Sequence, residues 1–592
     1  MARNTYKQDE NLEQEFDFRH LLRAWVYIKK YSGKMALALI LSAFAGVTGL
    51  ISPIIVQHAL DEAIPAADKR YLLELSLIMV GVFAISTVFS TVRSGIMVKV
   101  SQNIIYDIRK DLFEKLQKLP FSYYDDRPHG KILIRVVNYV NSVSDMLSNG
   151  LINVILEIFN LIFIVIFMFM VDVQLATVVM CGVPVLAVFM FWVKNKQRKA
   201  WQAVSNKNSN LNAYLQENIV GVRITQIFAR EEENSEIFRD LSDDCRKTWI
   251  SATGYSNVVW PGIDSIAVCI RAAIFVFGIL LFGAGEKTVG TVVAISGYAS
   301  RFWQPLMNLG NIFNTFINNI AYLERIFETL DEPVEIEDAE DATELPPVKG
   351  TVEFQNVCFS YEPEKPVLTN VSFKITPGES VALVGPTGAG KSTIVSLISR
   401  FYDVNSGRVL IDGCDVSKVT LHSLRSQMGI MLQDSFIFSG TIADNIRYGK
   451  TDATEEQIRD AAKVVCADDF IMKEENGYDS EVRERGSLLS QGQKQLISFA
   501  RTLISDPAIL VLDEATASID VQTEHALQTG LDNMMKGRTT FIIAHRLSTI
   551  KNCDRIMYID KGGITEQGTH DELMAKRGDY YRLYTAQLQE VS

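Results

Sequence analysis

Cysteine is scarce in this sequence, and no two of its seven cysteines are spaced as CxxC. That absence argues against a structural zinc site and against a redox-active dithiol, because both need closely spaced thiols. We therefore expect reduced thiols with structural roles. The cysteines are Cys181, Cys245, Cys269, Cys358, Cys414, Cys466 and Cys553.

The sequence also lacks an excess of basic residues. Its 58 Lys and Arg residues are outnumbered by 70 Asp and Glu residues, which gives a formal net charge of −12 and disfavours a nucleic-acid partner. Residues 1–16 are polar and acidic, so we expect no cleaved signal peptide. At 592 residues the chain is too long for one core, and we expect at least two domains.

Long apolar runs, by contrast, are abundant in the first half of the chain. A membrane-spanning helix needs roughly 20 mostly apolar residues, and the segment 72–92 (LLELSLIMVGVFAISTVFSTV) is a clear example. We predict six such spans, of which the last two are more polar. They cover residues 35–56, 72–92, 150–171, 173–193, 258–282 and 288–320.

The distribution of basic residues predicts how these spans are oriented. The long loops 93–150 and 194–257 are rich in Lys and Arg, whereas the short loops on the other side carry only Lys69, Arg70 and Lys287. Because positively charged loops stay in the cytoplasm, we expect both long loops and both termini to be cytoplasmic. We interpret the long loops as helical extensions of the spans.

Charged residues near and inside the spans need an explanation. Residues 16–31 mix bulky apolar and basic side chains, which suits a helix in the membrane interface; an ordinary cytoplasmic helix is the alternative. Ionisable residues within a span are costly unless they have a partner or water. Asp264, Arg271 and Arg301 could line a substrate path or make structural ion pairs and hydrogen bonds. For Glu157 we favour the structural interpretation.

The second half changes character after an acidic linker at 331–349. Residues 380–384 read as a short buried strand, which runs into the loop 385–392 (GPTGAGKS) and then a helix from Thr393. This strand–loop–helix context is the one that a phosphate-binding loop requires. Its glycines let backbone N–H groups approach the phosphates, and the helix N-terminus favours negative charge.

Side chains that suit ATP chemistry accompany this loop. Lys391 brings a positive charge to the phosphates, and Ser392 offers a hydroxyl to Mg²⁺. A second buried strand, 509–512, ends in Asp513 and Glu514. An aspartate at a strand end can hold Mg²⁺ through water, and the next glutamate is placed to polarise an attacking water. The sequence thus predicts binding and hydrolysis of ATP with Mg²⁺.

At this point the sequence resembles a family, the ATP-binding cassette (ABC) transporters, and specifically its exporters. The most specific element is the signature at 489–493 (LSQGQ), because other phosphate-loop ATPases lack it. The resemblance covers nearly the whole chain. It implies an α-helical six-span transmembrane domain (residues 1–330), the acidic linker, and an α/β P-loop nucleotide-binding domain, the ABC cassette (residues 350–592).

The resemblance also implies roles for individual residues. Tyr361 would stack on adenine, Gln433 would sense Mg²⁺ and couple to the spans, and His545 would contact the γ-phosphate. Ser490 and Gly492 would contact ATP held by a second cassette. The implied catalytic residues are Glu514, His545 and Gln433; the Mg²⁺ residues are Ser392, Gln433 and Asp513; the ATP-binding residues are Tyr361, Gly385, Pro386, Thr387, Gly388, Ala389, Gly390, Lys391, Ser392, Thr393, Asp513, Ser490, Gln491, Gly492 and Gln493.

Three further segments look like the family's coupling elements. Residues 121–135 and 217–231 resemble the cytoplasmic parts of the spans that meet a cassette. Residues 481–486, just before the signature, resemble the exporter-type segment that meets them.

The sequence departs from the family's pattern at residues 517–520 (ASID), where Ser-Ala-Leu-Asp is common, and in the signature. Gln491 replaces the first glycine of the consensus signature, which adds a side chain where backbone closely approaches phosphate. Since Lys391, Glu514 and His545 are intact, the combination resembles one subunit of the heterodimeric bacterial multidrug exporters, in which one composite ATP site is impaired. A homodimer that tolerates Gln491 is the alternative.

We therefore predict ATP-driven, multidrug-type export of hydrophobic or amphiphilic small molecules across a bacterial plasma membrane. A dimer with two composite ATP sites would work by alternating access. The alternatives are a lipid translocator with the same motor and an ATP-gated regulatory or channel-like ABC protein. The expected cofactors are ATP and Mg²⁺; the expected partners are a second ABC half-transporter chain, membrane lipids and the substrate, with no nucleic acid.

Overall fold

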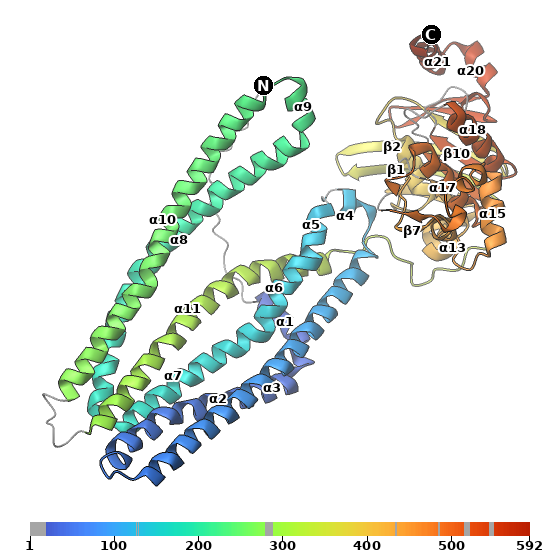
Figure 1. Cartoon of the computed structure of the whole chain (residues 1–592). Coiled ribbons are helices and arrows are strands. Elements are labelled where there is room, and N and C mark those ends of the chain that lie inside the picture. The colour runs from blue at the N-terminus through green and yellow to red at the C-terminus, as the bar shows by residue number, and fades with distance from the viewer. Residues whose placement is uncertain are drawn as a thin grey trace. The chain divides into compact units, whose positions relative to one another are not determined.

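The computed structural model describes residues 19–125, 127, 129–278, 288–431, 435–483, 486–513, 521–543 and 550–591. The chain divides into two compact units (Figure 1). The helical unit comprises residues 1–117 and 128–332, and the α/β unit comprises residues 118–127 and 333–592. The short segment 118–127 thus lies with the α/β unit, although its neighbours in sequence on both sides belong to the helical unit.

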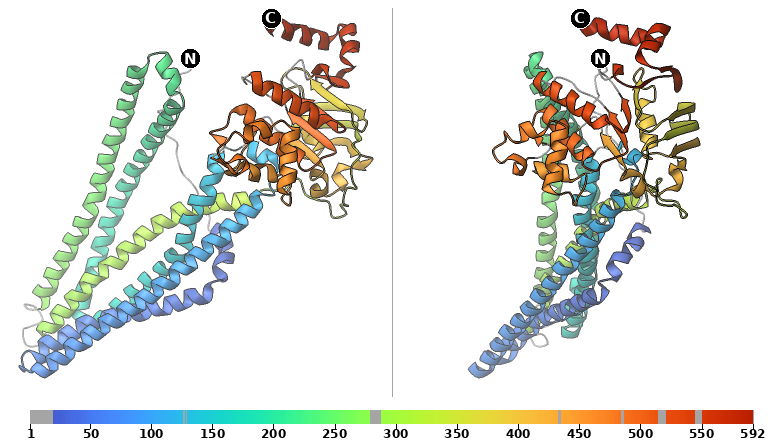
Figure 2. Two further views of the ribbon diagram at one scale, coloured as in Figure 1. Left: turned by 45° about the vertical axis from the view of Figure 1, so that its right-hand side comes forward. Right: turned by 90° about the vertical axis from the view of Figure 1, so that its right-hand side faces the viewer.

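The helical unit is built from long helices. In Figures 1 and 2, α8 and α10 run side by side and are joined by the short α9. The elements are α1 (Arg19–Lys29), α2 (Ser32–His58), η1 (Ala59–Ala63), α3 (Lys69–Leu116), α5 (His129–Ile134), η2 (Arg135–Tyr139), α6 (Val140–Asp145), η3 (Met146–Gly150), α7 (Leu151–Val171), α8 (Val173–Val220), α9 (Val222–Ile227), α10 (Glu231–Val276) and α11 (Val289–Asp331).

The apolar residues of this unit serve two purposes. Some fill cores, of which the two largest lie around α1, α3 and η3 and between α7, α8, α10 and α11. Many others point outward: Phe83, Met170 and Phe191 are each about three-quarters exposed. An apolar surface of this extent suits contact with lipid rather than water.

In the described part of the chain, five helical segments are long and apolar enough to cross a membrane. They are Ser32–Ala63, Lys69–Leu116, Gly130–Val171, Val173–Val220 and Glu231–Val276. The sixth predicted span falls in α11, which is long but outside this set, so that span stays a prediction. The end of the fifth predicted span, beyond residue 278, lies outside the described residues.

The α/β unit contains a six-stranded sheet with the order β12-β11-β3-β10-β9-β6, in which only the edge strand β12 is antiparallel to its neighbour. A four-stranded antiparallel sheet has the order β2-β1-β4-β5, and β7 pairs with β8. The strands are β1 (Val352–Glu362), β2 (Lys365–Ile375), β3 (Ser380–Val384), β4 (Ser406–Ile411), β5 (Cys414–Asp415), β6 (Met428–Met431), β7 (Gly440–Thr441), β8 (Glu481–Val482), β9 (Ile509–Asp513), β10 (Thr539–Ile543), β11 (Arg555–Asp560) and β12 (Gly563–Gly568).

Two cores cover the two faces of the six-stranded sheet. Successive side chains of a strand point to opposite faces. Accordingly, Val381 and Leu383 of β3 pack in the core shared with the antiparallel sheet, whereas Ala382 and Val384 pack in the core formed by helices. The helices are α4 (Phe121–Asp125), α12 (Lys391–Ile398), η5 (Val416–Lys418), α13 (Leu421–Arg425), α14 (Ile442–Arg447), α15 (Glu455–Val464), α16 (Asp468–Ile471), η6 (Gly477–Asp479), α17 (Gln491–Leu503), α18 (Val521–Met535), α20 (His570–Lys576) and α21 (Asp579–Val591).

Candidate functional site

The predicted phosphate loop lies between β3 and α12, at the carboxyl edge of the parallel sheet. Gly385 and Gly390 have φ angles of +145° and +102°, which side chains rarely tolerate. A Cβ on Gly385 would also lie 2.1 Å from the carbonyl oxygen of Ile559. Only glycine fits there, because the loop turns sharply over the end of the neighbouring strand β11.

The N-terminus of α12 has no side-chain cap, since Gly390 precedes it. Its first backbone N–H groups are the kind of donor that binds phosphate at a helix N-terminus. Ser392 is exposed in this first turn, whereas Thr393 is buried. The structure therefore presents a glycine-lined helix start with one exposed hydroxyl.

Lys391 folds back over this loop. Its ammonium donates hydrogen bonds to the carbonyl oxygens of Gly385 and Pro386, each at 2.8 Å. Burial lowers the pKa of Lys391, and the negative charge of Asp513 partly opposes that effect. The half-buried ammonium is placed to bind an anion, because phosphate oxygens can replace its contacts with the two carbonyl oxygens.

The ends of three parallel strands place Asp513 beside the loop. In the sheet register, Ile543 of β10 lies opposite both Leu383 of β3 and Asp513 of β9. The carboxyl ends of these strands therefore meet at one edge, which is where ligands bind in open α/β sheets. The predicted catalytic residues Glu514 and His545 follow β9 and β10 closely in sequence, but they lie outside the described residues, as does Gln433.

Tyr361 supplies an exposed ring next to α12. Its ring is about half exposed, and its hydroxyl lies 3.2 Å from the Thr393 hydroxyl. Edge contacts with Phe359 and Tyr402, at centroid distances of 4.8 and 5.0 Å, hold the ring in place. A fixed and exposed aromatic ring beside a phosphate site can stack on a base.

The signature segment starts a different helix, α17. Ser490 caps this helix: its hydroxyl accepts a hydrogen bond from the Gln493 N–H, and the Gln493 side chain accepts one from the Ser490 N–H. Gln491 is exposed, whereas Gly492 is buried. The helix start thus faces solvent and carries the extra side chain of Gln491 at its tip.

A partly buried arginine of α17, Arg501, which the sequence did not single out, ties the signature helix to the loop that follows Gln433. Arg501 donates to the Phe436 carbonyl at 2.8 Å, to the Asn445 carbonyl at 2.8 Å and to the Asn445 side chain at 2.7 Å. Burial lowers the pKa of Arg501. No motif signals this residue, because its partners lie in other elements.

One predicted coupling segment makes direct contacts within the α/β unit. The Phe121 ring of α4 lies 4.4 Å from the Phe401 ring, and the Tyr402 hydroxyl donates to the Asp125 carboxylate at 3.0 Å. The guanidinium of Arg425 lies over the Phe401 ring, 5.0 Å from its centroid. Tyr402 contacts both α4 and Tyr361, so the segment joins the candidate ATP site through one side chain.

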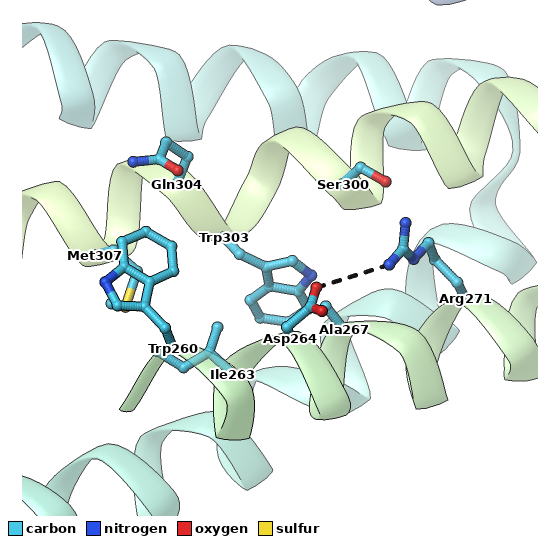
Figure 3. Close-up of a pocket in the computed structure, with 9 residues that line it drawn as sticks. All are labelled: Trp260, Ile263, Asp264, Ala267, Arg271, Ser300, Trp303, Gln304 and Met307. Carbon is cyan, nitrogen blue, oxygen red and sulfur yellow. Dashed lines mark ion pairs between the residues drawn. The ribbon is translucent and has the colours of Figure 1, made fainter. Parts of the chain in front are cut away.

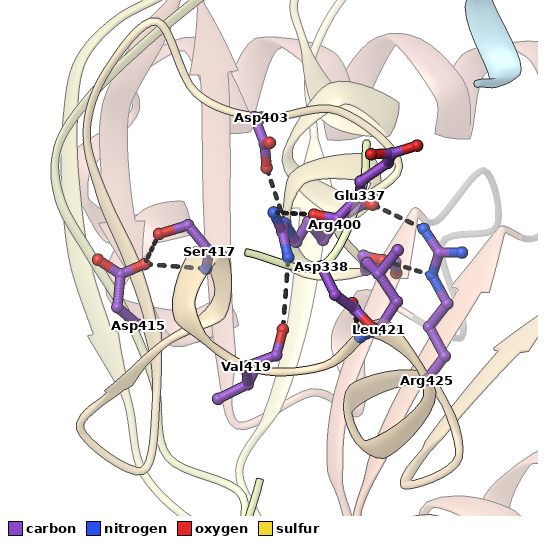
Figure 4. Close-up of polar contacts among 10 residues, drawn as sticks. Glu337, Asp338, Arg400, Asp403, Asp415, Ser417, Val419, Leu421 and Arg425 are labelled. Atoms are coloured by element: carbon purple, nitrogen blue, oxygen red, sulfur yellow. Dashed lines mark hydrogen bonds and ion pairs between the residues drawn. The ribbon is translucent and has the colours of Figure 1, made fainter. Parts of the chain in front are cut away.

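The acidic linker is fastened to the same region (Figure 4). Buried Arg400 donates to the Glu337 and Val419 carbonyls at 3.2 and 3.4 Å and pairs with Asp403 at 2.9 Å. The Leu421 N–H donates to Asp338 at 2.7 Å. These bonds order the linker on the surface of the α/β unit.

The other predicted coupling segment, 217–231, forms α9 and its flanks in the helical unit. Its apolar residues are strongly exposed, with Val220 at 82% and Ile227 at 77%. The backbone angles of Gly221 and Ala229 differ from those of an α-helix. The chain therefore turns at both residues and connects α8 to α10.

Comparison with known proteins identifies both halves of the chain. The family model described as the ABC transporter transmembrane region matches residues 35–306, and the model described as ABC transporter matches residues 368–517. The solved structure of a bacterial Atm1-family ABC exporter with ATP bound superposes with a TM-score of 0.77 at 28% identity. That match covers 94% of this chain and 98% of the other.

Curated relatives match along most of their length. YknV of Bacillus subtilis, an uncharacterized ABC transporter ATP-binding protein, is 39% identical over 99% of this chain and 98% of its own. The fatty acid ABC transporter ATP-binding/permease protein of Mycobacterium tuberculosis is 37% identical over 82% of this chain and 76% of its own. The ATP-dependent lipid A-core flippase of Syntrophus aciditrophicus is 34% identical over 97% and 95%.

Proposed function

The chain belongs to the ABC transporters as an exporter-type half-transporter, in which a transmembrane domain precedes an ATP-hydrolysing cassette, and from that premise we propose that it exports hydrophobic or amphiphilic small molecules. The observation that carries this proposal is the cavity between α10 and α11, which combines apolar and charged side chains within the membrane domain. Relatives named for fatty acids and for lipid A support amphiphilic cargo.

The ATP site works through the residues gathered at the edge of the parallel sheet. Lys391 and the start of α12 bind the phosphates, and the Tyr361 ring stacks on adenine. Ser392, Gln433 and Asp513 would hold Mg²⁺. Mg²⁺ when bound neutralises charge on the phosphates, and Glu514 polarises the water that attacks the γ-phosphate. Gln433 senses Mg²⁺ and couples the site to the spans, and His545 contacts the γ-phosphate.

Exporters of this family act as dimers, and we infer a heterodimer here. Gln491 stands at the tip of α17, where the partner's ATP would lie, so that composite site is impaired. The intact Lys391, Glu514 and His545 work with the partner's signature in the other site. The exposed apolar surface of α9 supports assembly, because a second cassette would cover it.

Transport then follows from closure of the cassettes. Closure around ATP pulls the coupling segments and switches the spans from inward- to outward-facing, a rigid-body transition, and hydrolysis with release resets it. In this arrangement six spans per chain cross the plasma membrane, both termini are cytoplasmic, and residues 16–31 lie in the membrane interface.

The second candidate function is lipid translocation with the same motor, which the flippase relative favours. Photolabelling with a lipid probe and with a dye, each competing against the other, separates the two: only a translocator gives the lipid the higher affinity. An ATP-gated channel is distinguished by ATP consumption, which rises with cargo only in a transporter.

The decisive measurement is the Mg-ATPase activity of this chain expressed alone in nanodiscs, together with its oligomeric mass. We expect little activity alone and recovery when a second cassette chain is co-expressed. A stable, active dimer of this chain alone would instead establish a homodimer that tolerates Gln491.

A further inference from the structure

A cavity of about 180 Å³ lies between α10 and α11 in the helical unit (Figure 3). Each helix contributes residues three or four positions apart, which places them on one face of that helix. The lining residues are Trp260, Ile263, Asp264, Ala267 and Arg271 from α10, and Ser300, Trp303, Gln304 and Met307 from α11. The cavity is thus built by two facing helix stripes.

The lining divides into an apolar floor and a polar rim. Ile263, Ala267 and Met307 are buried and form the floor, whereas Ser300 and Gln304 are exposed at the rim. Such a division suits a ligand with an apolar body and a polar end.

The charged pair at the rim is loose. Arg271 Nη2 and Asp264 Oδ1 are 3.9 Å apart, which is too long for a hydrogen bond. Both side chains also remain open to solvent, with 76% of Asp264 and 39% of Arg271 exposed. Each charge can therefore bind a ligand group with little loss of the existing contact.

Trp303 adds a buried hydrogen-bond donor to the cavity lining. Its side chain is only 5% exposed, and its indole N–H finds no hydrogen-bond acceptor among the described residues. A buried donor without an acceptor is costly and calls for an explanation. In Figure 3 the indole nitrogen lies toward the Asp264–Arg271 end of the cavity, away from Trp260 and Met307.

We propose that this cavity binds zwitterionic amphiphiles, which carry an acidic group and a cationic nitrogen on one apolar body. The acidic oxygens accept from the Arg271 guanidinium and the Trp303 N–H, the cationic nitrogen pairs with Asp264, and the body lies on the floor against the Trp260 ring. A ligand of a single charge would leave Asp264 or Arg271 without its counter-charge. The proposal rests on the proposed export function and names its substrate class.

Three xanthene dyes of nearly equal shape test the charge rule. Rhodamine 110 is a zwitterion, rhodamine 123 is its cationic methyl ester, and fluorescein is an anion. Fluorescence anisotropy with the assembled transporter in nanodiscs, without ATP, gives their affinities. We expect rhodamine 110 to bind about tenfold tighter than either other dye, since each charge-assisted contact contributes on that order. Equal affinities for the three dyes would overturn the proposal.

Variants assign the contacts to residues. Arg271→Gln and Trp303→Phe should weaken rhodamine 110 about tenfold while leaving rhodamine 123 within about twofold, and Asp264→Asn should weaken both dyes. Trp192→Phe, on α8 and outside the cavity lining, is the matched control. If Arg271→Gln fails to assemble, the conservative Trp303→Phe decides. For Arg271→Gln or Trp303→Phe, a loss that is equal for both dyes contradicts the assignment.

Two further experiments identify the source of the ligand and test the proposed export function on its own. Displacement of rhodamine 110 by lysophosphatidylethanolamine points to a lipid headgroup, and its absence points to a soluble amphiphile; both retain the zwitterion rule. ATP-driven uptake of the dyes into inverted vesicles tests export itself. Uptake regardless of dye charge overturns the charge rule and leaves export standing, whereas selective binding without uptake of any dye overturns export alone.

Discussion

Two helix starts within the α/β unit, those of α12 and α17, are built in opposite ways. The N-terminus of α12 follows three glycines of the loop and has no side-chain cap, so its N–H groups are available to phosphate. The N-terminus of α17 is closed by the reciprocal hydrogen bonds of Ser490 and Gln493. In this pair of hydrogen bonds the Ser490 oxygen is the acceptor, so the hydrogen of its hydroxyl can still donate a hydrogen bond.

The contrast supports the proposal that one cassette contributes to two ATP sites, each through a different helix start. The α12 start lies with Lys391 and Asp513 at one sheet edge, so this chain supplies most of one site. The α17 start offers a hydroxyl and an extra amide at Gln491, which in the proposed dimer would contact a phosphate held by the partner cassette. Substitutions at the α12 start should therefore abolish ATP hydrolysis, whereas substitutions at the α17 start should change its rate more modestly.

The largest effect is expected for Glu514, which follows β9 in the sequence. Glu514→Gln should lower ATP turnover about 10²- to 10⁴-fold, the usual contribution of a general base, while ATP binding persists. Turnover by phosphate release and binding of a fluorescent ATP analogue measure the two quantities separately. Glu475→Gln, an exposed carboxylate of the same cassette, is the control. Unchanged turnover would refute Glu514 as the base.

A smaller but still large effect is expected for binding at α12 itself. Lys391→Ala removes the ammonium that now bonds the Gly385 and Pro386 carbonyls. We expect ATP affinity to fall about 10- to 100-fold, because a charged hydrogen bond contributes about 1.5–3 kcal/mol. Titration with the fluorescent analogue checks this. Lys374→Ala, which removes a surface ion pair with Glu353, should leave affinity unchanged.

The α12 start was predictable from sequence because its determinants are local. A strand, a glycine loop and a helix follow one another, and the structure has β3 and α12 where the pattern indicated. Apolar composition likewise located the long helices. The contacts of Arg501 were not predictable, since its partners lie 56 and 65 positions away and no motif encodes them. The same holds for Trp303, whose missing acceptor is visible only once α10 and α11 are placed together.

At α17 we expect a tuning effect. Gln491→Gly restores the consensus glycine and should raise the ATPase activity of the chain expressed alone about tenfold, equivalent to about 1.4 kcal/mol. The reason is that the phosphate loop, Asp513, Glu514 and His545 are intact, so we expect the signature to limit a homodimer. Gln528→Ala, on α18, is the control. Gln495→Ala is unsuitable, because Gln495 is buried in α17. High activity before the substitution would show that Gln491 is tolerated.

The smallest effect concerns the scaffold that both helix starts share. Asp412 accepts from the Thr351 N–H at 2.8 Å and from two neighbouring N–H groups where the linker enters β1. Burial by itself raises the pKa of Asp412, but these bonds outweigh it and the pKa is lowered. The stabilisation is therefore complete above about pH 4, near the unfolded pKa of aspartate, and is lost as the pH falls through the lowered folded value.

Asp412→Asn should accordingly cost about 1 kcal/mol at pH 7, a value that already allows for partial exposure. The difference in melting temperature between variant and wild type, followed by intrinsic fluorescence, should shrink as the pH approaches 4 and below. Asp452→Asn, at an exposed position, controls for the change of net charge. A constant difference across this range would mean that the carboxylate charge is not what secures the linker. ATP affinity should stay unchanged throughout, because the bonds of Asp412 hold the backbone just before β1 and touch neither helix start.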